Sequence, residues 1–165
     1  MRTSRHVIAS PVSGTGVPLE EVDDAVLSSG VLGEGWAVEP RDGTVLAPID
    51  GVVTRMARTK HAFCMRGDDG TEVLVHIGID TVRLGGAPFE ALAHEGDRLP
   101  AGGPVLSADL DEIRGAGLSA LTAVIVCGDE DERVDVVAAP GGDVRAGRPL
   151  IEVRRAAEGG RGRDR

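Results

Sequence analysis

Two histidines, His61 and His76, are the residues of this sequence whose type and spacing most suggest chemistry. They flank a polar cluster at residues 67–70 (GDDG), which lies between two runs of strand-forming residues and is typical of a hairpin turn. If the hairpin is centred in the middle of this cluster, His61 directly opposes His76. A centre one residue later makes them diagonal neighbours, so either register predicts two adjacent imidazoles on one face.

Two adjacent imidazoles are suited to three kinds of chemistry. A metal site normally has three or four ligands, and no third histidine, cysteine or carboxylate has a convincing spacing. The pair could act as an acid and a base. Alternatively, one imidazole could attack phosphorus while the other donates a hydrogen bond to the transferred group. Thr59, two residues before His61, and Asp80, four after His76, favour phosphoryl transfer. A purely structural role for both histidines stays an alternative.

Side-chain alternation along the two runs predicts which neighbours share the histidine face. Phe63, Met65 and Leu74 are expected on it, and Val73 and Val75 on the opposite face. Both faces are apolar, and histidines rarely point into a core without partners. We therefore expect the histidine face to be an outer surface that contacts other proteins.

Composition restricts the classes of function. At 165 residues the chain is large enough for one domain with a buried core. The net charge of −9 argues against a nucleic-acid-binding surface, which needs a basic face. No run approaches the roughly 20 apolar residues of a membrane span, so no membrane insertion is expected. Cys64 and Cys127 lie far apart without CxxC spacing, which fits a reduced cytoplasmic compartment.

Short apolar runs separated by 24 glycines and 9 prolines predict many short strands. This spacing is typical of a closed or double-layered β structure. Short helical turns are expected in three places, at residues 18–25, 88–94 and 109–115. Asp109 is the expected N-cap of the last one. Residues 1–6 are expected to be a flexible lead-in, residues 7–154 the folded domain, and residues 155–165 a disordered tail.

The sequence contains two pairs of similar segments. Residues 10–14 (SPVSG) resemble residues 47–51 (APIDG), and residues 96–106 resemble residues 142–151 with one residue deleted. Two copies of each indicate a pseudo-symmetric β fold rather than a longer repeat array. Biotinyl and lipoyl domains share part of the second pattern, but the lysine that they modify is missing, since Lys60 is not flanked by methionine.

Two motifs around the histidines resemble the glucose-type enzyme IIA family of the bacterial phosphoenolpyruvate-dependent sugar phosphotransferase system. They are residues 59–63 (TKHAF) and residues 75–82 (VHIGIDTV), and the resemblance extends over about residues 7–154. The resemblance implies an all-β fold, a compact antiparallel β-sandwich with jelly-roll-like, pseudo-symmetric repeats and a few helical turns. It also implies a phosphotransferase component without a cofactor.

In that family, a histidine accepts a phosphoryl group from the phosphocarrier HPr and passes it to a cysteine of enzyme IIB during sugar uptake. By resemblance, His76 is the phosphorylated nucleophile, His61 donates a hydrogen bond to the phosphoryl group, and Thr59 orients the site. Residues implied to contact partner proteins are Glu34, Asp80, Phe63, Leu74 and Ile77. The family often has aromatic residues where this chain has Ala57 and Leu74.

The resemblance further implies a cytoplasmic monomer that serves a glucose-type permease. A regulatory module of the same fold, which would signal by docking onto permeases or kinases, is the alternative function. In that setting His61 and His76 could share a zinc ion. The sugar is not encoded in the chain, because the family's specificity lies in the permease.

Overall fold

The computed structural model describes residues 3–127 and 132–156, which form fourteen short strands and four short helical segments. The strands are β1 (Thr3–Ala9), β2 (Gly14–Pro18), β3 (Glu34–Pro40), β4 (Thr44–Leu46), β5 (Gly51–Met56), β6 (Ala62–Arg66), β7 (Glu72–Ile77), β8 (Phe89–Ala91), β9 (Arg98–Leu99), β10 (Pro104–Ala108), β11 (Thr122–Cys127), β12 (Glu132–Val136), β13 (Asp143–Val144) and β14 (Pro149–Ala156). The helical segments are η1 (Leu19–Glu21), α1 (Ala25–Ser28), η2 (Thr81–Leu84) and α2 (Leu110–Gly115).

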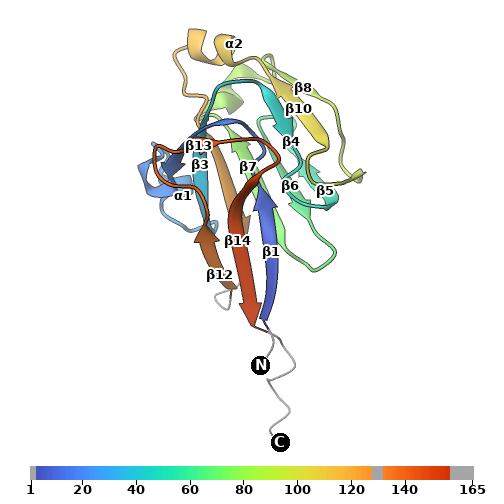
Figure 1. The fold of residues 1–165 in the computed structure, drawn as a ribbon. Helices are drawn as coiled ribbons and strands as arrows, with labels where there is room; N and C mark the ends of the chain where they lie inside the picture. The colour runs from blue at the N-terminus through green and yellow to red at the C-terminus, as the bar shows by residue number, and fades with distance from the viewer. Residues whose placement is uncertain (1–2, 128–131, 157–165) are drawn as a thin grey trace, which may run out of the picture.

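The strands form three antiparallel sheets (Figure 1). The largest has eight strands in the order β13-β2-β3-β11-β7-β6-β5-β9, and two three-stranded sheets have the orders β4-β10-β8 and β1-β14-β12. The predicted all-β antiparallel fold with few short helices is confirmed. No helix in the described part of the chain is long and apolar enough to cross a membrane.

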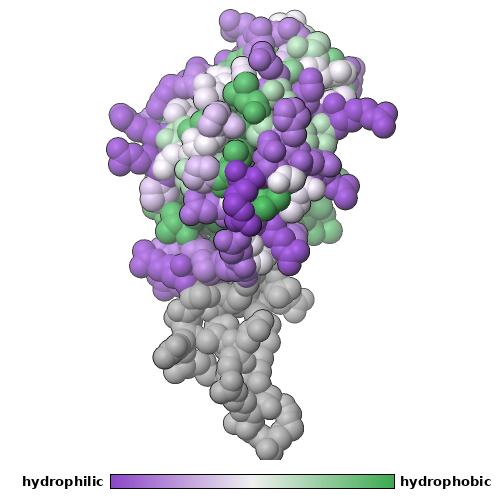
Figure 2. Space-filling model, turned by 90° about the vertical axis from the view of Figure 1, so that its right-hand side faces the viewer, coloured by the Kyte–Doolittle hydropathy of each residue, from purple (hydrophilic) through white to green (hydrophobic). Residues whose placement is uncertain are grey.

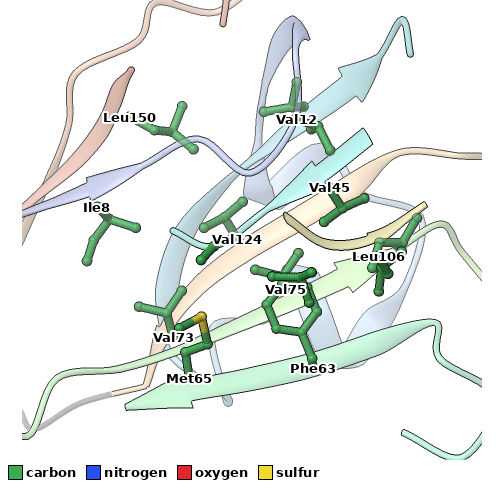
Figure 3. Close-up of a cluster of buried hydrophobic side chains, with 14 of the residues drawn as sticks. Ile8, Val12, Val45, Phe63, Met65, Val73, Val75, Leu106, Val124 and Leu150 are labelled. Atoms are coloured by element: carbon green, nitrogen blue, oxygen red, sulfur yellow. The ribbon is translucent and has the colours of Figure 1, made fainter. Parts of the chain in front are cut away.

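The main core lies between the inner face of the eight-stranded sheet and the two smaller sheets. Figure 3 shows side chains from all three sheets meeting there. Fully buried examples are Phe63 and Val75 from the large sheet, Leu106 from β10, and Ile8 and Leu150 from the two chain-end segments. Each such side chain contributes roughly 1.5–3 kcal/mol by leaving water.

A second apolar cluster lies on the other face of the large sheet. Leu19 and Leu27, from η1 and α1, pack there against Ala123 and Ile125 of β11. Asp24 starts α1 as its N-cap, accepting hydrogen bonds from two backbone N–H groups of the first turn at 3.0 and 3.2 Å. This small cover leaves the neighbouring part of the sheet, around His76, only partly shielded from solvent.

The internal repeat is visible as duplicated hydrogen bonds. The N–H of Ser10 donates to the carbonyl of Arg148 at 2.8 Å, and that of Ala47 donates to the carbonyl of Gly103 at 2.7 Å. In return, the N–H of Gly147 donates to the carbonyl of Ser10, and the N–H of Gly102 donates to the carbonyl of Ala47, each at 2.8 Å. The pairing of β2 with β13 likewise corresponds to that of β5 with β9. The segments resemble each other because they make the same contacts.

The beginning of the chain differs from the prediction. Residues 3–6 are not a flexible lead-in, because β1 begins at Thr3 and pairs with β14 along its whole length. Nδ1 of His6 lies 2.8 Å from a carboxylate oxygen of Asp69 in the β6–β7 turn. At the other end, β14 includes residues 155 and 156 of the predicted tail, and residues 157–165 lie outside the described part.

The three predicted helical turns have different outcomes. In the first region the chain forms η1 and α1, separated by residues 22–24. In the second region the prediction is wrong, because Phe89–Ala91 form β8 and pair with β10. The third is confirmed as α2, where the Asp109 carboxylate accepts a 3.0 Å hydrogen bond from the N–H of Glu112.

On the face that Figure 2 shows, hydrophobic residues occur in small groups among hydrophilic ones. This distribution is ordinary for a folded domain. Scattered exposed apolar side chains therefore do not by themselves indicate a binding surface.

Candidate functional site

The register of the β6–β7 hairpin differs from both predicted registers. Ala62 pairs with His76, and Phe63 pairs with Val75. The cause is a three-residue loop, in which the last position is Gly70 with φ +91. His76 consequently shares its face with Ala62, whereas Phe63 and Val75 point into the core.

The two imidazoles nevertheless lie together. His61 precedes the first residue of β6, in a bend where Lys60 adopts the left-handed conformation with φ +59. This bend releases His61 from strand alternation. Its ring centroid is 5.1 Å from that of His76, with the ring planes at 79°. The carbonyl of His61 also accepts a 2.7 Å hydrogen bond from the N–H of Ile77.

The tautomer of His76 follows from its backbone contact. Nδ1 of His76 is 2.9 Å from the carbonyl oxygen of Gly78. A carbonyl only accepts hydrogen bonds, so Nδ1 carries the proton. In the neutral ring, Nε2 then holds an available lone pair. His76 is therefore prepared to act as a nucleophile through Nε2.

His61 is held by Thr59. The Thr59 hydroxyl oxygen lies 2.6 Å from Nδ1 of His61. When this hydroxyl donates to Nδ1, the His61 proton resides on Nε2, from where it can be donated to a ligand. Thr59 therefore holds His61, whereas Nδ1 of His76 is held by the Gly78 carbonyl.

Both imidazoles have lowered pKa values. Burial, and then the neighbouring His76, holds the pKa of His61 below its ordinary 6.5. Burial also lowers the pKa of His76 from 6.5, against the opposing effects of the Gly78 hydrogen bond and the carboxylates of Asp24 and Asp80. At neutral pH both rings are therefore uncharged, and the Nε2 lone pair of His76 is free to react.

Asp24 is a site residue that sequence reasoning missed. Its charge acts on His76 from the N-terminus of α1. Its N-cap position, before the apolar residues of a short helix, was the available signal. Asp80 is exposed and in the left-handed conformation with φ +60, and its charge also acts on His76.

Glu34 lies at a different level of the sheet. It pairs with Val126 at the start of β3, whereas His76 is level with Ala123 and Ala37. Three residue pairs correspond to roughly 10 Å along the strands. Glu34 instead lines a cavity of about 320 Å³ together with Leu19 and Trp36 side chains, among others.

Two of the predicted docking residues are buried. Phe63 and Ile77 are each 1% exposed, so the prediction that they line a docking surface is wrong. The register explains the error for Phe63, whose side chain points into the main core. Ile77 follows His76 in β7, so strand alternation turns its side chain away from the His76 face and into the same core in any register. Leu74 is half-buried and packs against the second cluster. Val26 in α1 and Val82 in η2, each two residues after an acidic residue whose charge acts on His76, are 55% and 52% exposed.

At this site, the imidazoles of His61 and His76 are neighbours that could bind a metal ion. Across residues 3–127 and 132–156, no group of three or more histidine, cysteine, aspartate or glutamate side chains could hold a metal. A zinc ion shared by His61 and His76 would need further ligands from outside this part of the chain.

Comparison with known proteins identifies relatives over most of the chain. The family model for the phosphoenolpyruvate-dependent sugar phosphotransferase system, EIIA 1, matches residues 6–132. A glucose-specific EIIA component of Bacillus cereus is 36% identical over 125 residues, which are 76% of each chain. The solved structure of glucose permease IIA from Mycoplasma capricolum superimposes with a TM-score of 0.84 and 30% identity, covering 90% of this chain and 96% of the other.

Longer relatives contain a similar segment. The β-glucoside-specific EIIBCA component of Bacillus subtilis is 47% identical over 123 residues, 74% of this chain and 20% of that protein. The N-acetylglucosamine-specific EIICBA component of Klebsiella pneumoniae is 40% identical over 148 residues, 89% of this chain and 23% of that protein. The chain thus spans about a fifth of these two relatives. It belongs to the EIIA 1 family of the phosphoenolpyruvate-dependent sugar phosphotransferase system, whose members are phosphotransferase components.

Proposed function

We propose that the chain carries a phosphoryl group on Nε2 of His76, accepting it from HPr and passing it to a cysteine of enzyme IIB. The observation that carries this proposal is the hydrogen bond from Nδ1 of His76 to the Gly78 carbonyl, which leaves Nε2 unprotonated. The fusion of similar segments to EIIB and EIIC in longer relatives supports enzyme IIB as the acceptor.

In the accepting step, the Nε2 lone pair of His76 attacks the phosphorus of phospho-HPr in line with the donor P–N bond. The new N–P bond forms as the donor bond breaks, and the donor nitrogen keeps its electron pair. Phosphoryl transfer depends on such positioning and on charge stabilisation. The proton stays on Nδ1 of His76 throughout, and its hydrogen bond to the Gly78 carbonyl stabilises the positive charge that develops on the ring.

His61 stabilises the transferred group. Its ring lies at 79° to that of His76, at a centroid distance of 5.1 Å, so an N–H of His61 can reach oxygens of a phosphoryl group on Nε2. Thr59 fixes this ring through Nδ1. A hydrogen bond to a charged phosphoryl oxygen is stronger than one between neutral groups.

The surroundings of His76 fit a basic protein partner. Asp24 and Asp80 lie close enough for their charges to act on His76, and the exposed Val26 and Val82 lie on the same two elements. Carboxylates beside small apolar groups favour brief docking of a partner with basic residues around its own phosphorylated side chain. Leu74 is proposed to contribute at the edge of this surface, and a contact of Glu34 stays a prediction.

We also propose a cytoplasmic location and, as the partner, the permease of a glucose-type sugar system. The relatives that this chain resembles are named for β-glucosides, N-acetylglucosamine and glucose. The sugar itself is bound by the permease, and this chain supplies the phosphoryl group.

The test is phosphorylation in a reconstituted relay. The protein is incubated with phosphoenolpyruvate, enzyme I and HPr, and its mass is measured before and after mild acid treatment. One acid-labile phosphoryl group is expected, and His76→Gln should abolish it. His94→Gln is the control, because the His94 side chain is 79% exposed and lies outside the site. No label with active upstream proteins, or a label retained in His76→Gln, would refute the proposal.

A further inference from the structure

The Ile77–Gly78–Ile79 backbone connects both histidines to the rest of the sheet. The N–H of Ile77 donates to the carbonyl of His61 at 2.7 Å, and the carbonyl of Gly78 accepts a hydrogen bond from Nδ1 of His76 at 2.9 Å. The position of each imidazole therefore depends on how firmly this short segment is fixed.

Each peptide group of the segment is held by a specific contact. The N–H of Gly78 donates to the carbonyl of Leu121, and that of Ile79 donates to the carbonyl of Ser119, both at 3.0 Å. The carbonyl of Ile77 accepts a hydrogen bond from the Thr81 hydroxyl. The peptide between Ile77 and Gly78 is consequently anchored through both its carbonyl and its N–H.

Thr81 also restricts Gly78 by packing. Gly78 has φ +82, and glycine adopts positive and negative φ about equally readily, so its own backbone preference does not fix this conformation. A Cβ at this position would collide with the Cγ2 methyl of Thr81, so that methyl lies directly against the glycine. Thr81 is 0% exposed and belongs to the first turn of η2. Its hydroxyl and its methyl therefore hold the same peptide from one side.

We infer that Thr81 is a positioning residue for the phosphoryl transfer, acting through Gly78 on the tautomer of His76. This inference rests on the proposed function for its link to transfer, but its effect on the ring is independent of any partner. When the Thr81 hydroxyl holds the Ile77 carbonyl, the Gly78 carbonyl stays aimed at Nδ1. When that hold is lost, Gly78 can rotate, and the His76 proton can move to Nε2, which blocks the nucleophile.

The direct test is nitrogen NMR of the unphosphorylated protein at neutral pH, which distinguishes Nδ1–H from Nε2–H imidazole. In the wild type, His76 should be in the Nδ1–H form. Thr81→Val keeps the shape and removes the hydroxyl, and should increase the Nε2–H form. The rate of phosphoryl acceptance from HPr should fall roughly threefold to tenfold, the factor that one neutral hydrogen bond carries.

Two variants separate positioning from stability. Thr81→Ser keeps the hydroxyl and should restore the wild-type tautomer and rate, even if loss of the methyl lowers stability. Thr122→Val removes another fully buried hydroxyl, which donates to the carbonyl of Ala120 at 3.1 Å, and should leave the His76 tautomer unchanged. If Thr81→Val does not fold, Thr81→Cys, with its weaker donor, takes its place.

A wild-type tautomer and rate in a folded Thr81→Val, or a tautomer shift of the same size in Thr122→Val, would overturn the inference. The proposed function fails differently. If the wild type accepted no phosphoryl group while Thr81→Val still shifted the tautomer, Thr81 would position His76 for some other reaction.

Discussion

His76 donates a hydrogen bond from Nδ1 to the carbonyl of Gly78, 2.9 Å away and only two residues further along the chain. The acceptor is part of the same strand end as the ring, so ring and acceptor move together. Because this contact decides which nitrogen is free, any change that displaces the Gly78 carbonyl also changes the reactive atom. The predictions below depend on this relationship and on the charges around it.

Gly78→Ala should lower the free energy of unfolding far more than Gly85→Ala does. A Cβ at Gly78 would collide with Thr81 and lie 2.8 Å from the carbonyl oxygen of Ser119, in addition to the cost of φ +82. Backbone strain and overpacking together should lower the free energy of unfolding by about 3 kcal/mol, as measured by urea denaturation. Gly85→Ala is the matched control: φ is +65 and a Cβ would meet open space, so about 1 kcal/mol is expected. Equal losses would contradict the packing described here.

The free energy of unfolding should decrease on mild acidification. The folded pKa values of His61 and His76 are lowered, whereas in the unfolded chain both are near 6.5. Their contribution is therefore fully present above about pH 6.5, and it is lost as the pH falls, because the unfolded chain binds protons first. The loss ends below the folded pKa values. Urea denaturation between pH 5 and 7.5 measures it, and replacing both histidines by glutamine should flatten this part of the profile.

The rate of phosphoryl acceptance should also decline in acid, and at a lower pH than for a free imidazole. Only neutral His76 has the Nε2 lone pair, and its pKa lies below 6.5. The midpoint of the decline should coincide with the His76 titration followed by NMR. A midpoint above 6.5 would mean that the neighbouring carboxylates outweigh burial.

Asp24→Asn should lower the pKa of His76 further. The Asp24 carboxylate raises this pKa through its charge, and asparagine removes the charge while remaining a good N-cap for α1. NMR titration of His76 measures the shift, and denaturation checks that α1 is intact. Asp23→Asn, a change of the same charge at the exposed neighbouring position, is the control and should leave the His76 titration unchanged.

His61→Gln should still accept a phosphoryl group but pass it poorly to enzyme IIB. Acceptance requires Nε2 of His76, which the Gly78 carbonyl continues to define. Loss of the His61 hydrogen bond removes charge stabilisation that is worth about 1.5–3 kcal/mol for a charged partner. Rapid-quench measurement of both half-reactions separates the steps. Abolished acceptance in His61→Gln together with normal acceptance in His76→Gln would reverse the two roles.

Val26→Lys should raise the KM for HPr without affecting stability. Val26 is 55% exposed on the element that carries Asp24, so a lysine there would repel a basic partner. Val137→Lys is the matched control, because Val137 is 57% exposed and lies just after β12, outside the site. The effect should weaken as salt is added, since screening reduces repulsion between exposed charges. An equal change in both variants would place the docking surface elsewhere.

Much of the site could be predicted because its residues are close in sequence and chemically distinctive. The register of the β6–β7 hairpin could not be predicted. A glycine at the last position of a three-residue loop shifts the pairing by one residue, and this exchanges the faces, so Phe63 moves from the surface to the core. The histidines still meet because Lys60 has a positive φ, which a lysine rarely adopts and a pattern does not reveal.

The repeats were predictable for a different reason. Each copy makes the same backbone contacts, which require similar turn residues in similar places, and similarity is visible in a single sequence. The first part of β1, residues 3–6, was missed because its partner β14 lies at the opposite end of the chain, so no local pattern reports the pairing. Asp24 was missed because its role depends on where α1 lies relative to β7.

The pairing of β1 with β14 has a mechanical consequence. Thr3 is the register partner of residue 156, so the start of β1 and the end of β14 lie side by side (Figure 1). A force applied through both ends would open the β1–β14 ladder one residue pair at a time, as a zipper opens, instead of loading all its hydrogen bonds together. The eight-stranded sheet that holds His76 is a separate sheet, so it would bear little tension until that ladder had opened.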